Sequence, residues 1–244
     1  MKRIAILQSN YIPWKGYFDI IASVDEFILY DEVQYTKNDW RNRNIIKTGQ
    51  GTQWLSIPVR HTGRFGQPVD AVRVADAAWT KKHWASLSQA YAKAPFFESL
   101  APAVREVYEA CREEEYLSAV NRRFIALVAG LLGLSARIVS SRDYAVTGDK
   151  NERLVELCRR AGAGAYLSGP AARDYLDETL FTEAGIGVAW MDYSGYPEYP
   201  QLHGPFVHAV SVLDLLFNVG PDRAGEYMRP LPFSSSRVFN GSCS

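Results

Sequence analysis

Short, mainly apolar runs and helical patterns alternate at both ends of the chain. Runs of three or four residues that end in polar residues or turns are typical of buried parallel strands, and they occur at residues 4–7, 27–30, 136–139, 165–167 and 188–191. Helical segments are expected beside them, at residues 17–23, 152–160, 171–176 and 211–217. The predicted fold class is therefore α/β, a mostly parallel Rossmann-like sheet with helices on both faces.

The middle of the chain has helical periodicity. Apolar residues recur at spacings of three and four over residues 79–94 and 117–131, and a further helix is expected over 101–112. A hairpin is expected before them, pairing residues 43–46 with 53–57 around a Gly-Gln-Gly turn. We therefore predict a single α/β domain over residues 1–232, with a helical insertion at about 76–134, and a flexible tail over 233–244.

Composition narrows the class of protein. Lys and Arg number 27 and Asp and Glu number 27, so the net charge of zero argues against attachment to nucleic acid or an anionic membrane by bulk charge. A local basic patch stays open. Three scattered cysteines are too few for a disulfide framework, and no His or Cys pair has metal-ligand spacing. Since no apolar stretch is long enough for a signal peptide or a membrane span, we expect a cytoplasmic protein with no metal site and no membrane partner.

Polar residues follow the predicted strands, at the edge of the sheet where ligands bind in open α/β folds. If the strands are parallel, these ends meet in one crevice. The alternative is that strand ends are polar because loops contact water. Ser168 has no nucleophile-elbow motif, so it is assigned to anion binding at a helix start or to helix capping. The candidate binding residues at these ends are Gln8, Asn10, Ser168, Gly169 and Asp192, and Asp31 is a candidate catalytic residue.

Residues 10–18, NYIPWKGYF, join a tight turn to aromatic and cationic side chains. Lys15 suits an anion, and Tyr11, Trp14 and Tyr17 offer flat surfaces with polar groups. The layout is similar to the phosphate-binding turn of nucleotidylyltransferases, but Trp14 and Tyr17 stand where that turn has histidines. Aromatic packing over the turn is the competing interpretation.

Residues 31–47 combine cations, asparagines and aromatic rings. Arg41 and Arg43 face the same side if the segment is extended, so together they can hold a phosphate or a carboxylate. Trp40 and Tyr35 can stack on a base or a sugar. A solvated basic hairpin is the alternative. The substrate-binding residues predicted in this segment are Gln34, Tyr35, Lys37, Trp40, Arg41, Asn42 and Arg43.

Residues 192–206 form a loop with three tyrosines, three prolines and one histidine. Tyr199 and Gln201 are expected to bind a sugar or a nucleotide. Among the four histidines of the chain, His203 is the best candidate for a general base, because it lies in a polar loop. His203 and Asp31 are therefore the two catalytic candidates.

Together these motifs resemble the WbqC-like family of bacteria. The residues that carry the resemblance spread over about residues 4–220, and they are QSNYIPWKGYFDII, FILYDEVQYTKNDWRNRNIIK, WLSIPV, GDKNERL, YLSGPAARDYLDE, PQLHGPF and SVLDLLF. The resemblance implies a role in O-antigen or other polysaccharide biosynthesis. It also suggests a glycine transferase that acylates an amino sugar, and it assigns no catalytic residue.

The motifs and the resemblance combine into one hypothesis. It is a transferase that moves a glycyl or other aminoacyl group onto an amino sugar or a related amine, in polysaccharide or natural-product biosynthesis. No cofactor is assigned; ATP or an activated aminoacyl donor is expected to supply the group, the donor bears a phosphate, and tRNA is one candidate carrier. A homodimer is left open. The alternatives are an ATP-dependent nucleotidyl- or adenylate-forming enzyme, and a non-catalytic protein that binds a nucleotide sugar or RNA.

Overall fold

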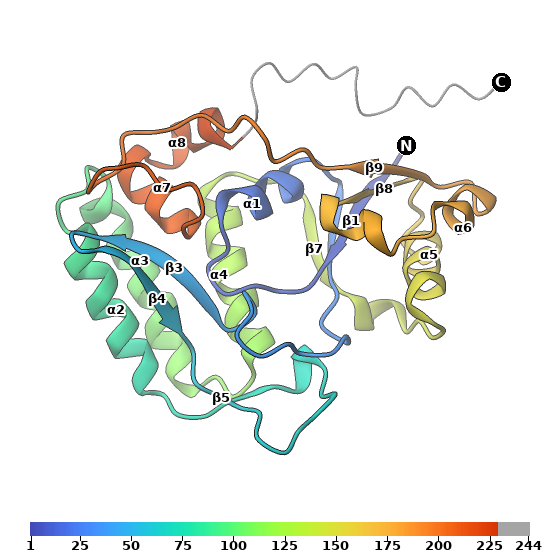
Figure 1. Ribbon diagram of the computed structural model, residues 1–244, viewed down its shortest axis with the longest axis horizontal. Helices are drawn as coiled ribbons and strands as arrows, with labels where there is room; N and C mark the ends of the chain where they lie inside the picture. Colours follow the sequence, from blue (N-terminus) through green and yellow to red (C-terminus); the bar gives the residue numbers. More distant parts are fainter. Residues whose placement is uncertain (229–244) are drawn as a thin grey trace.

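Five parallel strands form the central sheet of the computed structural model, which describes residues 1–228 (Figure 1). The order across the sheet is β7-β2-β1-β8-β9. The α/β fold class and all five predicted strands are confirmed, whereas the predicted tail at 233–244 lies outside the described residues. The strands are β1 (Arg3–Leu7), β2 (Glu26–Leu29), β7 (Arg137–Ser140), β8 (Ala165–Ser168) and β9 (Gly187–Trp190).

Helices and two small antiparallel sheets surround the central sheet. The hairpin expected over residues 43–57 is confirmed as β3 and β4, and the three helices α2 to α4 lie inside the segment expected to be a helical insertion. The small sheets pair β3 (Arg43–Thr48) with β4 (Gly51–Ser56), and β5 (Val59–Arg60) with β6 (Arg73–Val74). The helices are α1 (Lys15–Ala22), α2 (Ala78–Tyr91), α3 (Phe97–Ala110), α4 (Leu117–Leu131), α5 (Lys150–Arg160), α6 (Glu178–Glu183), α7 (Val212–Val219) and α8 (Pro221–Ala224).

The α3 helix begins four residues before the predicted start at residue 101. The Phe97 ring packs against the Phe217 ring, with a centroid distance of 5.1 Å, and Leu100 is buried one turn later. These contacts extend the buried face of the helix toward its N-terminus. The pattern within the segment did not show them, because Phe217 lies more than a hundred residues away in the sequence.

The helix predicted at residues 171–176 is wrong. The chain forms a short 3-10 turn there, Pro170–Asp174, and the α-helix begins only at Glu178. Asp177 decides this start, because its carboxylate accepts a 3.0 Å hydrogen bond from the Thr179 N–H and caps the new helix.

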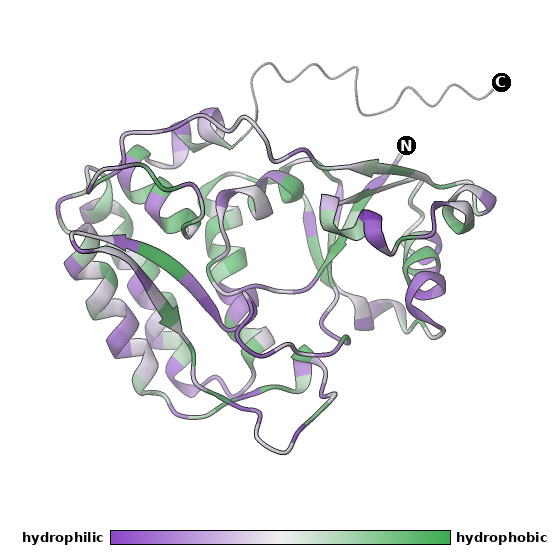
Figure 2. Cartoon of the chain, in the orientation of Figure 1, coloured by the Kyte–Doolittle hydropathy of each residue, from purple (hydrophilic) through white to green (hydrophobic). Residues whose placement is uncertain are grey.

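The central sheet separates two hydrophobic cores. Ile4 and Ile6 of β1 pack in the smaller core with residues of α5 and α6. Ala5, between them, belongs to the larger core, which includes residues of α1, α2, α3, α4 and α7. Alternate side chains of one strand therefore serve opposite faces, as a sheet covered on both sides requires. Figure 2 shows the hydrophobic residues of the central strands.

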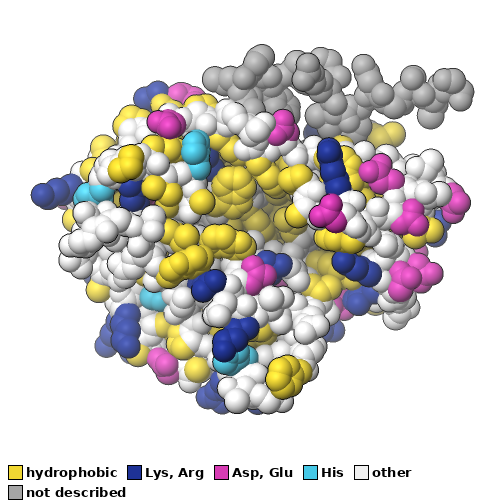
Figure 3. All heavy atoms as spheres, viewed as in Figure 1, with side chains coloured by type: hydrophobic (Ala, Val, Ile, Leu, Met, Phe, Trp, Pro, Cys, Tyr) yellow, Lys and Arg dark blue, Asp and Glu magenta, His cyan; other side chains and the backbone are white. Residues whose placement is uncertain are grey.

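The strand order creates a topological switch point between β1 and β8. The chain runs outward from β1 through β2 to β7, and then returns to β8 on the other side of β1. Connections leave the carboxyl ends of these two strands in opposite directions, which opens a crevice between them. In the space-filling view of Figure 3, the face of the molecule turned toward the reader has a hollow near its centre, with hydrophobic side chains on its walls.

Replacing Phe124 with Ala tests the larger core. The Phe124 side chain is fully buried, and its ring centroid lies 5.5 Å from that of Tyr11 and 4.8 Å from that of Tyr108. We expect Phe124→Ala to lower the free energy of unfolding by about 3–5 kcal/mol in urea titrations, because it leaves a cavity. Phe65→Ala is the matched control: this ring is 98% exposed, so its loss changes stability by less than about 0.5 kcal/mol. Equal effects of the two variants would contradict the assigned core.

Candidate functional site

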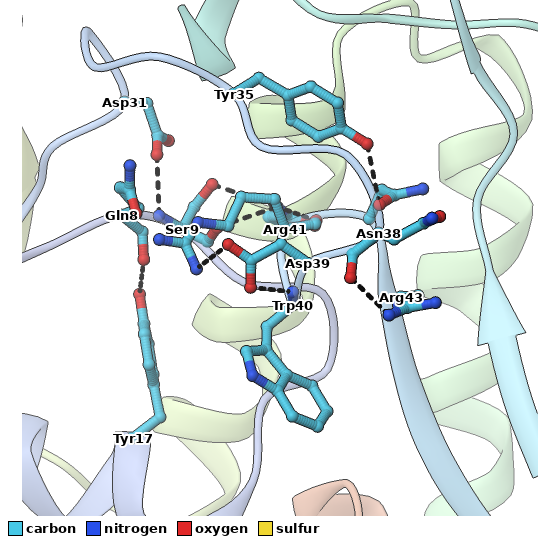
Figure 4. A network of polar contacts seen from close by, with 12 residues as sticks. Gln8, Ser9, Tyr17, Asp31, Tyr35, Asn38, Asp39, Trp40, Arg41 and Arg43 are labelled. Carbon is cyan, nitrogen blue, oxygen red and sulfur yellow. Dashed lines mark hydrogen bonds and ion pairs between the residues drawn. The ribbon is translucent and has the colours of Figure 1, made fainter. Parts of the chain in front are cut away.

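A buried carboxyl group fixes the loop after β1. The Ser9 N–H donates a 2.7 Å hydrogen bond to Asp31 Oδ1. The two residues meet because β1 and β2 run side by side with Leu7 opposite Leu29. Ser9 lies two positions after Leu7, and Asp31 lies two positions after Leu29. Ser9 is fully buried and Asp31 is 7% exposed. The carboxyl candidate from the sequence therefore lies against the loop that follows β1, and Figure 4 shows its hydrogen bond to Ser9. This loop leaves the strand at the switch point.

An amide on α4 holds the same loop from below. The Asn121 Nδ2 group lies 3.1 Å from Ser9 Oγ and 3.3 Å from Ser9 O, and it donates a 2.9 Å hydrogen bond to the Arg41 carbonyl. Asn121 is fully buried. It joins the loop after β1 to the segment that carries Arg41. Sequence reasoning missed this residue, although a polar side chain on the otherwise apolar face of α4 was a usable signal.

Arg41 is the cation of the crevice. Its guanidinium lies 3.1 Å from the Asp39 carboxylate. Burial raises the pKa of Asp31, Tyr17 and Tyr175, and the charge of Arg41 opposes the rise at each of them. Because Tyr17 belongs to α1 and Tyr175 follows β8, the field of Arg41 spans both sides of the switch point.

Asp31 has the protonation behaviour of a general base. Burial raises its pKa to about 6; the hydrogen bonds from Ser9 and the charge of Arg41 oppose this rise, and the charge of Asp70 adds to it. A carboxyl group with a pKa near 6 is mostly ionised at pH 7, and it is more basic than an exposed carboxylate. It can therefore accept a proton from an attacking nucleophile.

Gly169 and Tyr193 border the crevice on the β8 side. A Cβ atom added to Gly169 would lie 3.7 Å from the Tyr193 hydroxyl oxygen, so the two are close neighbours. The Tyr193 ring packs edge-on against Trp14 at a centroid distance of 5.1 Å, and its charge raises the pKa of Tyr17 in addition to the larger effect of burial. The Tyr17 hydroxyl donates to Gln8 O. Tyr193 therefore belongs to the site, although the sequence indicated only its loop.

Lys15 lies among aromatic rings. Its Nζ donates a 3.2 Å hydrogen bond to Pro197 O and lies 5.0 Å from the ring centroid of Tyr196 and 5.3 Å from that of Tyr199. Lys15 is 2% exposed. Burial lowers its pKa to about 8, and the charge of Asp214 opposes the change. Contact of Lys15 with an anion stays a prediction.

Tyr199 and Gln201 use their polar groups inside the fold. The Tyr199 hydroxyl and the Gln201 amide each donate a 2.7 Å hydrogen bond to Asp214 Oδ1 on α7. Lys47 of β3 donates a 2.7 Å hydrogen bond to Gln201 Oε1. This buried network fixes the loop of residues 193–208 against the hairpin and α7.

Two further predicted residues lie apart from this crevice group. Tyr11 is fully buried, and its hydroxyl hydrogen-bonds His83 Nδ1 and the Tyr108 hydroxyl. His203 Nε2 lies 3.2 Å from Ala90 O at the end of α2, and its ring lies beside Gly49 in the hairpin turn. The structure therefore does not bring His203 together with Asp31.

Most of the other predicted residues lie at the strand ends and in the segment between β2 and β3, and Arg43 begins β3. Tyr35 donates a 2.9 Å hydrogen bond to Asn42 Oδ1, and Arg43 donates to the carbonyl of Asn38. Asn10 has a buried Oδ1 without a hydrogen-bond partner among the described residues. Ser168 is buried, whereas the exposed members are Gln34, Lys37, Trp40 and Asp192.

Within residues 1–228, no group of three or more His, Cys, Asp or Glu side chains is arranged to hold a metal ion. In the same part of the chain, no helix combines the length and the apolar character that crossing a membrane requires.

The comparisons with known proteins cover the whole crevice. The model of the WbqC-like protein family matches residues 8–226, which include Ser9, Asp31, Arg41, Asn121 and Tyr193. The chain belongs to the WbqC-like family. It is 50% identical over 231 residues to Uncharacterized protein Rv1507c of Mycobacterium tuberculosis, and the match covers 94% of this chain and 98% of the mycobacterial protein. No solved structure matches the chain.

The raised pKa of Asp31 predicts how stability depends on pH. Because the folded-state pKa of about 6 exceeds the ordinary 3.8, the folded protein binds more protons than the unfolded chain between pH 4 and 6. Wild-type stability therefore loses this contribution as the pH rises through that window. Asp31→Asn keeps an acceptor for the Ser9 N–H, but its amide does not titrate, so the variant does not lose this contribution. The free energy of unfolding of the variant, relative to wild type, should therefore rise by about 2 kcal/mol from pH 4 to pH 7 in urea titrations.

Asp192→Asn provides the opposite control. Hydrogen bonds from the Ser194 side chain and N–H lower the pKa of the exposed Asp192 carboxyl. Its variant should therefore lose stability relative to wild type as the pH rises toward 4, and it should show no gain from pH 4 to pH 7, where the carboxyl group is ionised in both the folded and the unfolded chain. A difference between Asp31→Asn and wild type that stays constant from pH 4 to pH 7 would contradict the buried carboxyl.

Proposed function

We propose that this WbqC-like protein transfers an aminoacyl group from an activated donor to the amino group of a small acceptor, with Asp31 as the general base. The observation that carries the proposal is the position of Asp31, a buried carboxyl group with a pKa raised to about 6 at the switch-point crevice. The glycyl group and an amino-sugar acceptor are the pair that the family resemblance favours.

The proposed step balances without a cofactor. The neutral amine nitrogen attacks the carbonyl carbon of an aminoacyl ester, a C–N bond forms and the C–O bond to the carrier breaks. Asp31 accepts the proton that the nitrogen loses and returns it to the departing oxygen. A base whose pKa lies near the working pH can do both.

Residues around Asp31 have supporting roles in this step. The Arg41 guanidinium supplies positive charge close to the carboxyl group, where it can stabilise the oxyanion that develops on the acyl carbonyl. The hydroxyls of Tyr17 and Tyr193 stay protonated, because burial raises the pKa of each tyrosine. Because the Tyr17 hydroxyl already donates to Gln8 O, the half-buried Tyr193 hydroxyl is the neutral group assigned to a hydroxyl of the sugar. These roles follow from position and charge.

The test is amide formation followed by mass spectrometry, with glycyl esters and adenylates as donors and amino sugars as acceptors. Asp31→Asn should lower turnover at least about 100-fold with little change in KM for the acceptor. The pH profile of the wild-type rate should bend near pH 6, where Asp31 becomes protonated, and Asp31→Asn should lack this bend, whereas protonation of the acceptor amine lowers both rates alike. Asp222→Asn, which alters an exposed carboxyl on α8, is the control and should keep the wild-type rate and pH profile.

Three results would overturn the proposal. One is the absence of an amide product with every donor and acceptor; the second is full turnover by Asp31→Asn. The third is a loss in His203→Ala as large as that in Asp31→Asn, which would move the base to the end of α2. Release of pyrophosphate from ATP without any acceptor would instead favour the adenylate-forming alternative.

A further inference from the structure

Positive charge is concentrated in one segment of a chain whose net charge is zero. Residues 33–75 contain seven Lys and Arg residues but only two acidic residues, Asp39 and Asp70. Arg41 pairs with Asp39, and Arg142 from outside the segment pairs with Asp70. Figure 3 shows Lys and Arg side chains prevailing in the lower part of the hollowed face, while Asp and Glu gather at the right.

Three cations of this segment are exposed and unpaired. Lys37, Arg60 and Arg64 form no ion pair with any residue that the structure describes, and all three are exposed. A cation held in water without a partner costs the fold little and stays available to an external anion. Three unpaired cations on one segment suit a ligand that carries several negative charges.

The same segment displays two exposed indole rings. Trp40 is 40% exposed and Trp54 is 44% exposed, whereas the other four tryptophans of the chain are buried or half-buried. The centroids of the two rings lie 5.4 Å apart with an interplanar angle of 34°. The Arg43 guanidinium lies 4.2 Å from the Trp54 ring centroid and supports it from one side. The exposed rings offer a surface on which a planar group can stack.

Backbone hydrogen bonds fix this surface beside the crevice. Tyr11, two residues after Ser9, donates a 3.0 Å hydrogen bond from its N–H to Trp40 O. The Ile57 N–H donates to Asn42 O at 2.7 Å, which holds the end of β4 against the Trp40 segment. The Tyr35 N–H donates to Gln67 O at 2.9 Å, so the loop with Arg60 and Arg64 lies alongside. We call the surface of Lys37, Trp40, Arg43, Trp54, Arg60 and Arg64 the ribbon surface.

Rings for stacking together with unpaired cations define a ligand class. Single-stranded nucleic acids are bound in this way, with bases on aromatic rings and phosphates on Lys and Arg. A neutral sugar would use the rings but leave the three cations without a partner. We infer that the ribbon surface binds the single-stranded end of an RNA, with bases on Trp40 and Trp54 and phosphates on Lys37, Arg60 and Arg64.

The ribbon surface lies beside the crevice that contains Asp31, so bound RNA could carry the aminoacyl donor of the proposed reaction. Trp40 precedes Arg41 in the sequence, and the charge of Arg41 lowers the pKa of Asp31. An ester at the end of an RNA strand stacked on Trp40 would therefore lie next to the crevice. The RNA would then be the carrier of the aminoacyl donor. This last point rests on the proposed transferase function, whereas the binding itself involves no turnover.

The experiment measures binding of a fluorescent hairpin RNA with a four-nucleotide single-stranded 3′ end and no acyl group. By anisotropy, log K should fall with log salt at a slope of about −2, since each phosphate contact on a single strand contributes about −0.7. Trp40→Ala combined with Trp54→Ala should weaken binding at least about tenfold, because stacking on both rings is lost. Changing Lys37, Arg60 and Arg64 to Ala should remove most of the salt dependence.

Matched controls separate the surface from charge in general. Arg105→Ala, Arg159→Ala and Arg223→Ala together also remove three exposed cations, from α3, α5 and α8, and should leave the affinity unchanged. All substituted side chains are at the surface, so circular dichroism and the melting temperature should match wild type. A blunt-ended RNA duplex should bind at least about tenfold more weakly than the hairpin with the free end.

Several outcomes would overturn the inference. They are equal affinity for the blunt duplex, unchanged affinity in the double Trp variant, and displacement of the RNA by a neutral oligosaccharide. The transferase proposal is read out separately. RNA binding without amide formation would leave the ribbon surface standing and remove the reaction, and amide formation from a free glycyl adenylate without RNA binding would do the reverse.

Discussion

The hydrogen bonds at Ser9 are the interaction on which the candidate site depends. The Ser9 N–H bonds the Asp31 carboxylate, while the Ser9 hydroxyl and carbonyl face the Asn121 amide. Three elements that are distant in sequence meet at this one buried residue: the ends of β1 and β2, and helix α4. Buried polar groups that lose a partner cost about 1–3 kcal/mol each, so the three elements hold one another in place.

The burial of this junction also changes the pKa of Asp31. Removing Asp31 from water disfavours its charge and raises its pKa to about 6, while Arg41 and the Ser9 hydrogen bonds keep it from rising further. The fold thus holds a carboxyl group in a state that costs stability above pH 6. A raised pKa of this kind is what the proposed role of Asp31 as a general base requires.

A second buried network fixes the loop of residues 193–208 against α7 and β3. Asp214 accepts hydrogen bonds from Tyr91, Tyr199 and Gln201, and burial raises its pKa against these bonds. Because Tyr199 and Gln201 belong to the same loop as Tyr193, the network sets where the Tyr193 ring contacts Trp14. The tyrosines of this loop therefore divide their work: Tyr199 anchors the loop, and Tyr193 borders the crevice.

The sequence by itself determined the fold class, the five strands, the hairpin and the edge of the sheet where Asp31 and Gly169 lie. Local periodicity reports which side of a segment is buried, and parallel strands bring their carboxyl ends to one edge whatever their order. It could not determine which distant side chain each polar residue meets. Tyr11 entered the core beside His83, His203 went to the end of α2, and Asn121 became the link to Ser9. Those partners were decided by the tertiary structure, because they depend on how helices more than seventy residues away pack against the loop after β1 and against the loop that carries His203.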